Sequence, residues 1–121
     1  MHLFELQTDK ITFLADPDGV TGKQFIKGTK STYTYPDGEK CTGHKRVGTN
    51  DELNDFKKAT KKGYFSLAWS SDSVWVIFSE KTWKTERPVP EKKLREIQQY
   101  ASDHDIPKKY LSKDFIDHYT N

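Results

Sequence analysis

The longest regular pattern in the chain is an alternation of apolar with small or polar residues between positions 64 and 79. A two-residue turn at Ser71 and Asp72 would fold this stretch into a β-hairpin with three apolar cross-strand pairs. The pairs would be Phe65 with Phe78, Leu67 with Val76, and Trp69 with Val74. Because strand side chains alternate between faces, these residues would share one face and fix the register. The other face carries Trp75 and Ile77, so we expect a further element to cover it.

Two more hairpins are predicted from the first half of the chain. In the first, over residues 2–14, a turn at Thr8-Asp9 would pair Leu6 with Ile11 and Phe4 with Phe13. In the second, over residues 33–41, Pro36-Asp37-Gly38 favours a type I turn with a bulged glycine, which would pair Tyr35 with Glu39 and Tyr33 with Cys41. Between them, residues 16–19 predict a turn and residues 24–26 a short strand.

A helix is predicted to begin at about Asn50. Thr49 and Glu52 have the spacing of a capping box, in which each side chain satisfies a backbone amide of the other. The apolar stripe of this helix is Leu53, Phe56, and Ala59 or Thr60. Gly63 would end it and lead into the hairpin over residues 64–79.

The C-terminal third is predicted to be helical. Pro90 precedes a helix over residues 91–102 whose apolar stripe is Leu94, Ile97 and Ala101, with Tyr100 beside it. This helix is our candidate for covering Trp75 and Ile77. One or two short helical turns are expected over residues 108–119, with Ser112 as a cap and Leu111, Phe115, Ile116 and Tyr119 facing inward. Residues 81–89 are interpreted as a charged connector.

Residues 53–82 combine a short helix, Lys-Lys-Gly63-Tyr64-Phe65-Ser66-Leu67, a break, and Val74-Trp75-Val76-Ile77-Phe78-Ser79. This order resembles the repeat appended to some plant casein-kinase-like proteins. In that family a helix and a Gly-aromatic pair precede a strand and then a Trp-containing strand that ends in serine. The resemblance covers about a quarter of the chain. It implies a helix followed by a hairpin and carries over no activity.

The predicted fold class is α+β: a twisted antiparallel sheet of hairpins, with the helix after Thr49 and the C-terminal helical segment packed on it. A length of 121 residues suits a single domain over 1–121. Apolar residues make up only 33% of the chain, so seven Phe, six Tyr and three Trp must supply much of the core. The sequence shows neither an apolar run long enough to span a membrane nor a leader, so we expect a cytoplasmic protein with no membrane partner.

The hairpin over residues 33–41 separates into two faces. Tyr33, Tyr35, Cys41 and Val47 fall on one. The polar face carries Lys30, Thr32, Thr34, Lys40, Thr42, His44 and Arg46. Its cations and hydroxyls suit phosphate contacts, which makes nucleic-acid binding an alternative function. Against it, that face has no aromatic residue to stack bases, and the formal charge of the chain is only +2.

Catalytic motifs and metal-ligand spacings are absent from the sequence. The chain has no phosphate-binding loop and no GxSxG, HExxH or CxxC motif, and Cys41 is its single cysteine. Histidines beside carboxylates at residues 103–105 and 117–118 supply too few ligands for zinc. We therefore expect no metal and no cofactor, and favour a protein that is not an enzyme. A small ribonuclease using His44 is a second alternative, although Glu39 would lie on the opposite face.

Trp83 lies in the predicted connector, where an exposed tryptophan is typical of an interface anchor. Together with the polar hairpin it favours a small non-catalytic binding protein whose partner is another protein. An inhibitor or adaptor, of the kind that small mobile-element genes encode, fits this size. The candidate partner-binding residues are Trp83, Lys30, Lys40, His44 and Arg46.

Overall fold

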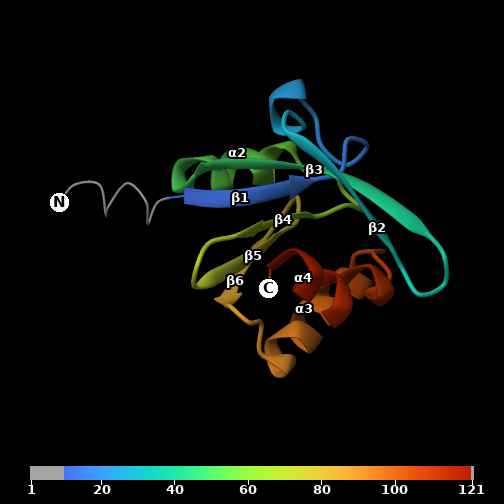
Figure 1. The fold of residues 1–121 in the computed structure, drawn as a ribbon. Coiled ribbons are helices and arrows are strands. Elements are labelled where there is room, and N and C mark those ends of the chain that lie inside the picture. The colour runs from blue at the N-terminus through green and yellow to red at the C-terminus, as the bar shows by residue number, and fades with distance from the viewer. Residues whose placement is uncertain (1–9, 121) are drawn as a thin grey trace.

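The computed structural model describes residues 10–120 of the chain. They form a six-stranded antiparallel sheet in the order β2-β3-β1-β4-β5-β6, with helices on both faces (Figure 1). The strands are β1 (Lys10–Ala15), β2 (Thr29–Thr34), β3 (Lys40–Thr49), β4 (Ser66–Trp69), β5 (Ser73–Ile77) and β6 (Thr82–Glu86). The helical elements are η1 (Lys23–Phe25), η2 (Asn50–Glu52), α2 (Leu53–Ala59), α3 (Glu91–Asp103), η3 (Lys108–Leu111) and α4 (Lys113–Thr120). The α+β class predicted from the sequence is confirmed.

The central hairpin has the predicted register. Leu67 of β4 is opposite Val76 of β5, and Trp69 is opposite Val74. Phe65 and Phe78 lie just beyond the strand ends, with ring centroids 6.4 Å apart. The register is correct because alternation on both strands leaves one pairing that buries the apolar set on a single face.

Strand β1 lies in the middle of the sheet, between β3 and β4. Phe13 is opposite Arg46 on one side and Ala68 on the other. The first half of the hairpin predicted over residues 2–14 lies outside the described residues. Its second half is β1, both of whose edges are paired with these long-range partners. Such pairings have no local turn signal in the sequence.

The β2–β3 hairpin also has the predicted register. Tyr33 is opposite Cys41, the Tyr35 amide donates to the Glu39 carbonyl at 2.8 Å, and Gly38 has a φ of 92°, the conformation of a bulged glycine. The turn at residues 16–19 is confirmed by a bond from the Gly19 amide to the Asp16 carbonyl. The strand predicted over residues 24–26 is wrong, because Lys23–Phe25 forms a 3-10 turn that buries Phe25 against Phe56.

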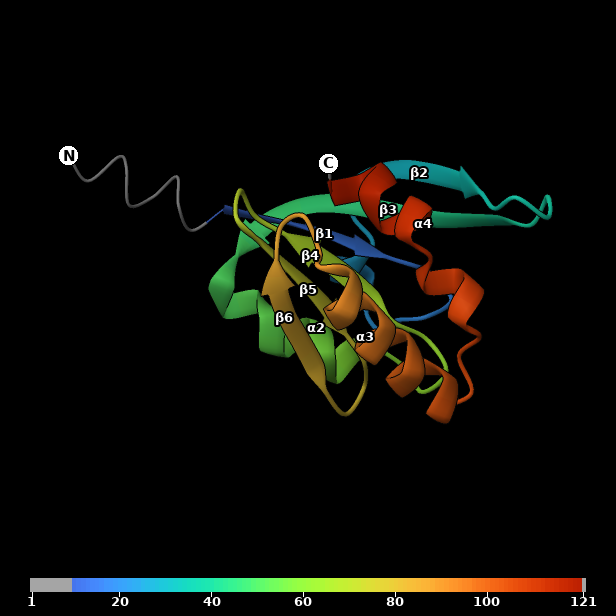
Figure 2. The same cartoon turned by 90° about the horizontal axis from the view of Figure 1, so that it is seen from below.

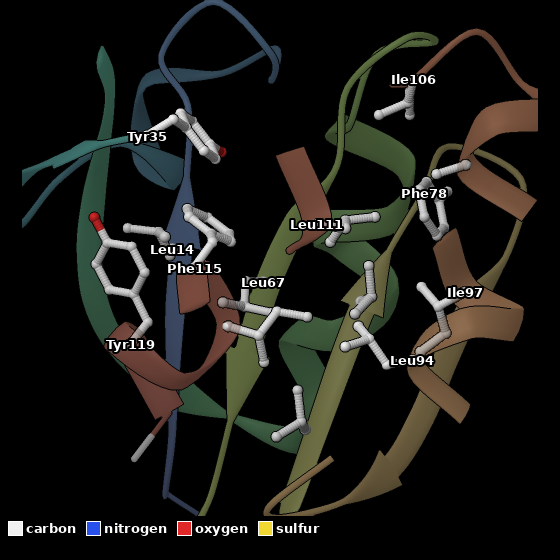
Figure 3. Packing of buried hydrophobic residues seen from close by; sticks show 14 residues of the cluster. Leu14, Tyr35, Leu67, Phe78, Leu94, Ile97, Ile106, Leu111, Phe115 and Tyr119 are labelled. Atoms are coloured by element: carbon white, nitrogen blue, oxygen red, sulfur yellow. The ribbon is translucent and has the colours of Figure 1, made fainter. Parts of the chain in front are cut away.

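The sheet separates two hydrophobic cores. The α2 core lies between the sheet and α2; it consists of Ile11, Phe13, Ala15, Val20, Phe25, Phe56, Ala59, Ala68, Trp75 and Ile77. The C-terminal core lies between the opposite face and the segments α3, η3 and α4. Figure 3 shows its side chains, among them Leu14, Tyr35, Leu67, Ile97, Phe115 and Tyr119. Viewed from below, α4 lies over the β2–β3 half of the sheet and α3 over the β5–β6 half (Figure 2).

Helix α3 does not cover Trp75 and Ile77, so that prediction is wrong. Its stripe of Leu94, Ile97 and Ala101 is buried as predicted, but in the C-terminal core. Trp75 and Ile77 belong to the α2 core instead. Both faces of the central hairpin are apolar, so the sequence pattern indicates that each face packs against another element. The pattern does not indicate which helix packs on which face.

The helix ends largely follow the predicted signals. The capping box between Thr49 and Glu52 is present, and the first turn is η2. Helix α2 ends at Ala59, before Gly63, because the chain becomes extended at Thr60. Near the C-terminus, the Ser112 hydroxyl accepts from the Phe115 amide at 3.1 Å, which confirms it as a cap.

The connector predicted over residues 81–89 contains strand β6, so that interpretation is wrong. Trp83 is opposite Val76 and packs against Tyr100, with ring centroids 5.9 Å apart. The Nζ atom of Lys81 lies 3.9 Å from the Trp83 ring centroid. The Trp83 side chain is half-buried rather than exposed. That Trp83 anchors an interface stays a prediction. A half-buried ring offers a partner less surface than an exposed one.

Candidate binding groove

A groove of about 680 Å³ opens at one end of the C-terminal core. Five segments that are distant in sequence form its walls: the turn after β1, the β2–β3 hairpin, the segment before β4, the connector from α3 into η3, and α4. Its polar lining includes Asp16, Asp18, Glu39, Lys40 and Asp105, and its aromatic lining includes Tyr35, Tyr64, Phe65, Tyr110, Phe115 and Tyr119.

A second hollow of about 370 Å³ adjoins the first. The two share Gly63, Tyr64, Asp105 and Ile106, so they meet at the Tyr64 ring. The second hollow adds Lys62, Glu80, Asp103 and His104 to the polar lining. We call the two together the acidic groove.

The charge of the acidic groove is opposite to that of the whole chain. Its lining carries six carboxylates and two lysines, a formal charge of −4 with His104 neutral. Counting Lys109, which lies beside Glu39, gives −3. The chain as a whole carries +2. The negative charge is therefore concentrated in the groove, where low-dielectric walls strengthen its field.

Asp16 is the most enclosed carboxylate of the groove. It is half-buried, and burial raises its pKa, opposed by the bond that its Oδ1 accepts from the Asp18 amide at 2.8 Å. Within residues 10–120 no lysine or arginine forms an ion pair with it. A cation bound in the groove would compensate this desolvated charge.

Tyr64 is held at the junction of the two hollows. Its side chain is 38% exposed, and Val47 is the other large apolar residue this exposed within the described part of the chain. A Cβ atom placed on Gly19 would lie 2.7 Å from the Tyr64 ring. The absence of a side chain at Gly19 therefore lets the ring rest against the turn after β1.

A charged clamp fixes the hairpin wall of the groove. Lys109 donates to Asp37 at 2.7 Å and to Glu39 at 2.5 Å, and the Tyr110 hydroxyl donates to Glu39 at 2.7 Å. The Lys109 hydrogen bonds hold the pKa values of both carboxyls below their ordinary range. In addition, the Tyr35 hydroxyl donates to the Tyr110 carbonyl at 3.1 Å. The tip of the hairpin is thereby tied to η3.

The groove lacks an activated nucleophile. Burial raises the pKa of the Cys41 thiol, so it is protonated and poorly nucleophilic at neutral pH. Burial likewise raises the pKa of Tyr35. In the described range, His, Cys, Asp and Glu residues form no group of three or more that could hold a metal ion.

The predicted basic face exists, but its cations are unequal. Lys30 is opposite His44, and both share a face with Lys40 and Arg46. Lys30 and Lys40 are exposed. Arg46 forms an ion pair with Glu52 at 2.5 Å and lies over the Phe56 ring. The ribonuclease alternative needs His44 to act together with the cations of this face. One of these cations, Arg46, is already paired with Glu52. Both nucleic-acid alternatives stay predictions.

Sequence reasoning did not select the groove residues. Asp16, Tyr64 and Tyr110 come from a turn, a segment before a strand and a 3-10 helix, and no motif links them. Lys40 is the one predicted site residue that also lines the groove.

The chain was compared with family models, curated proteins and solved structures. No family model matches it, and no curated protein and no solved structure does so either. The resemblance of residues 53–82 to the plant casein-kinase-like repeat therefore stays a prediction. Among residues 10–120, no helix has the length and apolar character needed to cross a membrane.

Proposed function

We propose that this protein is a non-catalytic binding module whose acidic groove holds a positively charged segment of a protein partner. The observation that carries the proposal is the lining of the groove: six carboxylates and several tyrosine rings in a chain with a net positive charge. An inhibitor or adaptor acting in the cytoplasm is the form we favour. A single cysteine and hence no internal disulfide agrees with that compartment.

Lysine and arginine side chains match this lining chemically. Their aliphatic parts pack on aromatic rings, and their charged ends form charge-assisted hydrogen bonds with carboxylates. Arginine fits best, because its planar guanidinium can stack on a tyrosine while donating to a carboxylate. Tyr64 and Asp16 offer such a pair on the wall of the larger hollow.

The shape supports an extended segment rather than a compact small molecule. Two hollows meet at Tyr64, so a ligand following the groove would pass this ring and place side chains on either side of it. Tyrosine and arginine are also the residue types enriched where binding energy is concentrated in protein interfaces.

Asp16 supports the proposal through its cost to the fold. A half-buried carboxylate whose pKa is raised by burial is less favourable to the folded state than a neutral amide of the same shape. Residues that lower stability without a structural benefit are characteristic of binding sites. A cation from the partner would remove this penalty on binding.

The experiment is fluorescence anisotropy with short labelled peptides on a common Gly-Ser scaffold. One peptide carries two arginines, one two lysines, one two glutamates and one no charge. We expect the arginine peptide to bind most tightly and the glutamate peptide not to bind. Asp16→Asn should weaken the arginine peptide by roughly tenfold, the usual magnitude for one charge-assisted contact. Asp55→Asn is the matched control, because Asp55 is exposed on α2, across the sheet from the groove.

Two results would overturn the proposal. Equal affinity for the arginine and glutamate peptides would show that the groove does not select charge. Tight binding of a labelled single-stranded RNA, lost in Lys30→Ala but not in Asp16→Asn, would instead favour the nucleic-acid alternative.

A further inference from the structure

The two edge strands of the sheet, β2 and β6, differ in how they are protected. In an antiparallel ladder, residues that exchange hydrogen bonds with the neighbour alternate with residues that point their backbone groups outward. Tyr35 bonds to Glu39 across the β2–β3 hairpin, so the outward groups of β2 belong to Lys30, Thr32 and Thr34. Phe78 bonds to Lys81, so those of β6 belong to Thr82, Lys84 and Glu86.

Strand β6 carries the features that prevent pairing with another chain. Two of its three outward positions, Lys84 and Glu86, are charged. Charged residues are a usual means by which proteins block sheet edges. Strand β2 has six residues and a single charge, at Lys30. Its outward residues Lys30, Thr32 and Thr34 are all exposed. A proline follows each edge strand at the same distance, so the charged outward positions are what distinguish the two.

We infer that β2 pairs with the β2 strand of a second copy of this chain, antiparallel and about a two-fold axis at Thr32. Thr32 would face its own symmetry mate, and Lys30 would face Thr34 in both directions. Every outward amide then meets a carbonyl over three residue pairs. Thr–Thr is a favourable cross-strand pair, and no like charges face each other directly.

The remaining contacts of this arrangement are also compatible. The two Lys30 side chains would be four residues apart along the strands, about 13 Å at the usual rise, which exceeds the screening length at physiological salt. On the face covered by α4, Ser31 of one copy would lie opposite Tyr33 of the other. The Ser31 hydroxyl is already bonded to the Tyr119 hydroxyl at 3.0 Å, so that side of the edge is ordered by α4.

The interface is small, so the dimer is expected to be weak and dependent on concentration. Sedimentation equilibrium of the full chain measures it directly. We expect the native chain to shift from monomer to dimer as its concentration rises toward about 1 mM, a typical limit for weak association. Thr32→Pro removes one outward amide and no bond within the sheet, and should leave a monomer. Lys84→Pro is the matched control on β6 and should dimerise like the native chain.

A second variant protects the test against misfolding of Thr32→Pro. Thr32→Lys keeps the backbone amide but places two lysines face to face on the axis, and should also give a monomer. Circular dichroism establishes that each variant is folded. A native chain that is monomeric at all concentrations up to about 1 mM overturns the inference. The inference is also overturned if folded Thr32→Lys still forms the dimer. It is overturned as well if Lys84→Pro loses the dimer while the two Thr32 variants keep it.

Discussion

Asp16 is where stability and the proposed binding oppose each other. The carboxylate lies half-buried on the wall of the acidic groove and has no ion-pair partner within residues 10–120. Its Oδ1 atom accepts the Asp18 amide, a role that an asparagine oxygen fills equally well. The charge itself therefore gives the turn little that an amide would not.

The change Asp16→Asn is expected to raise the melting temperature at pH 7 by a few degrees. Burial raises the pKa of Asp16 above its unfolded value, so the folded state holds the proton more strongly. The penalty is absent below the unfolded pKa and develops as pH rises through the folded pKa. The stabilisation should therefore vanish at pH 3, where both states are protonated. Thermal unfolding at the two pH values, with Asp55→Asn as reference, measures this; a lower melting temperature at pH 7 would contradict it.

Single residues were the hardest level to predict from sequence. Arg46 was selected for its charge and position on the polar hairpin face, and its position is as expected. Its partner Glu52 lies in the capping box, and the sequence did not show that the two meet. Asp16 was interpreted as a turn residue, which it is. Its place in a groove depends on segments 19 or more residues away, beyond the reach of local patterns.

The β2–β3 hairpin and η3 form a unit through side chains rather than through backbone pairing. Lys109 bridges Asp37 and Glu39, and Tyr110 adds a bond to Glu39. Each group is exposed, so a single pair would contribute little. Four groups that share one site restrict the hairpin tip more than an isolated pair does, because ordering one side chain orders the others.

Replacing Lys109 by methionine is expected to loosen the hairpin tip at neutral pH. The pKa values of Asp37 and Glu39 are lowered by Lys109, so the clamp stabilises the fold above the unfolded pKa of these carboxyls, about 4. The contribution is lost as pH falls through the lowered folded values. Hydrogen exchange of the Gly38 amide should therefore be faster in Lys109→Met than in the native chain at pH 7.

The matched control is Lys113→Met. Lys113 pairs with Asp117 one turn further along α4. Replacing Lys113 therefore removes one positive charge, as Lys109→Met does, but leaves the contacts of the hairpin tip in place. Unchanged Gly38 exchange in Lys109→Met, or equal acceleration in both variants, would contradict the role of the clamp. Urea unfolding supplies the other half of the test, because the difference between the native and Lys109→Met midpoints should be smaller at pH 3 than at pH 7.

Elements were predicted well where one local pattern decides them. The registers of the β4–β5 and β2–β3 hairpins follow from alternation and turn chemistry, and the capping box at Thr49 marks a real helix start. Strand β6 was missed because its outward residues are charged. That is the expected composition of a protected sheet edge, which resembles a solvated loop in sequence.

At the scale of the whole molecule, the arrangement of elements is the part that sequence could not supply. Both faces of the central strands are apolar, so α2 and α3 could each have covered either one. The place of β1 between β3 and β4 joins strands that are far apart in the chain. The acidic groove follows from that arrangement, since its five walls meet only once the sheet order and the positions of the C-terminal helices are fixed.

The groove and the β2 edge should act independently. Thr32→Pro removes an amide that points away from β3, so the β2–β3 ladder that forms one groove wall is left intact. We therefore expect Thr32→Pro to bind the arginine peptide within about twofold of the native affinity, less than the tenfold that one lost contact costs. In the same way, Asp16→Asn should leave the dimer dissociation constant unchanged.

Anisotropy with the peptide at protein concentrations below and above dimer formation distinguishes the possibilities. Affinity that rises with dimer fraction in the native chain but is weak in Thr32→Pro would mean that the second copy completes the groove. That result would contradict independence while leaving both sites in place. Equal affinity in the two proteins, together with loss in Asp16→Asn, would mean that each copy binds its segment alone. A dimer would then present two separate grooves, and a partner with two basic segments would gain affinity from their joint occupation.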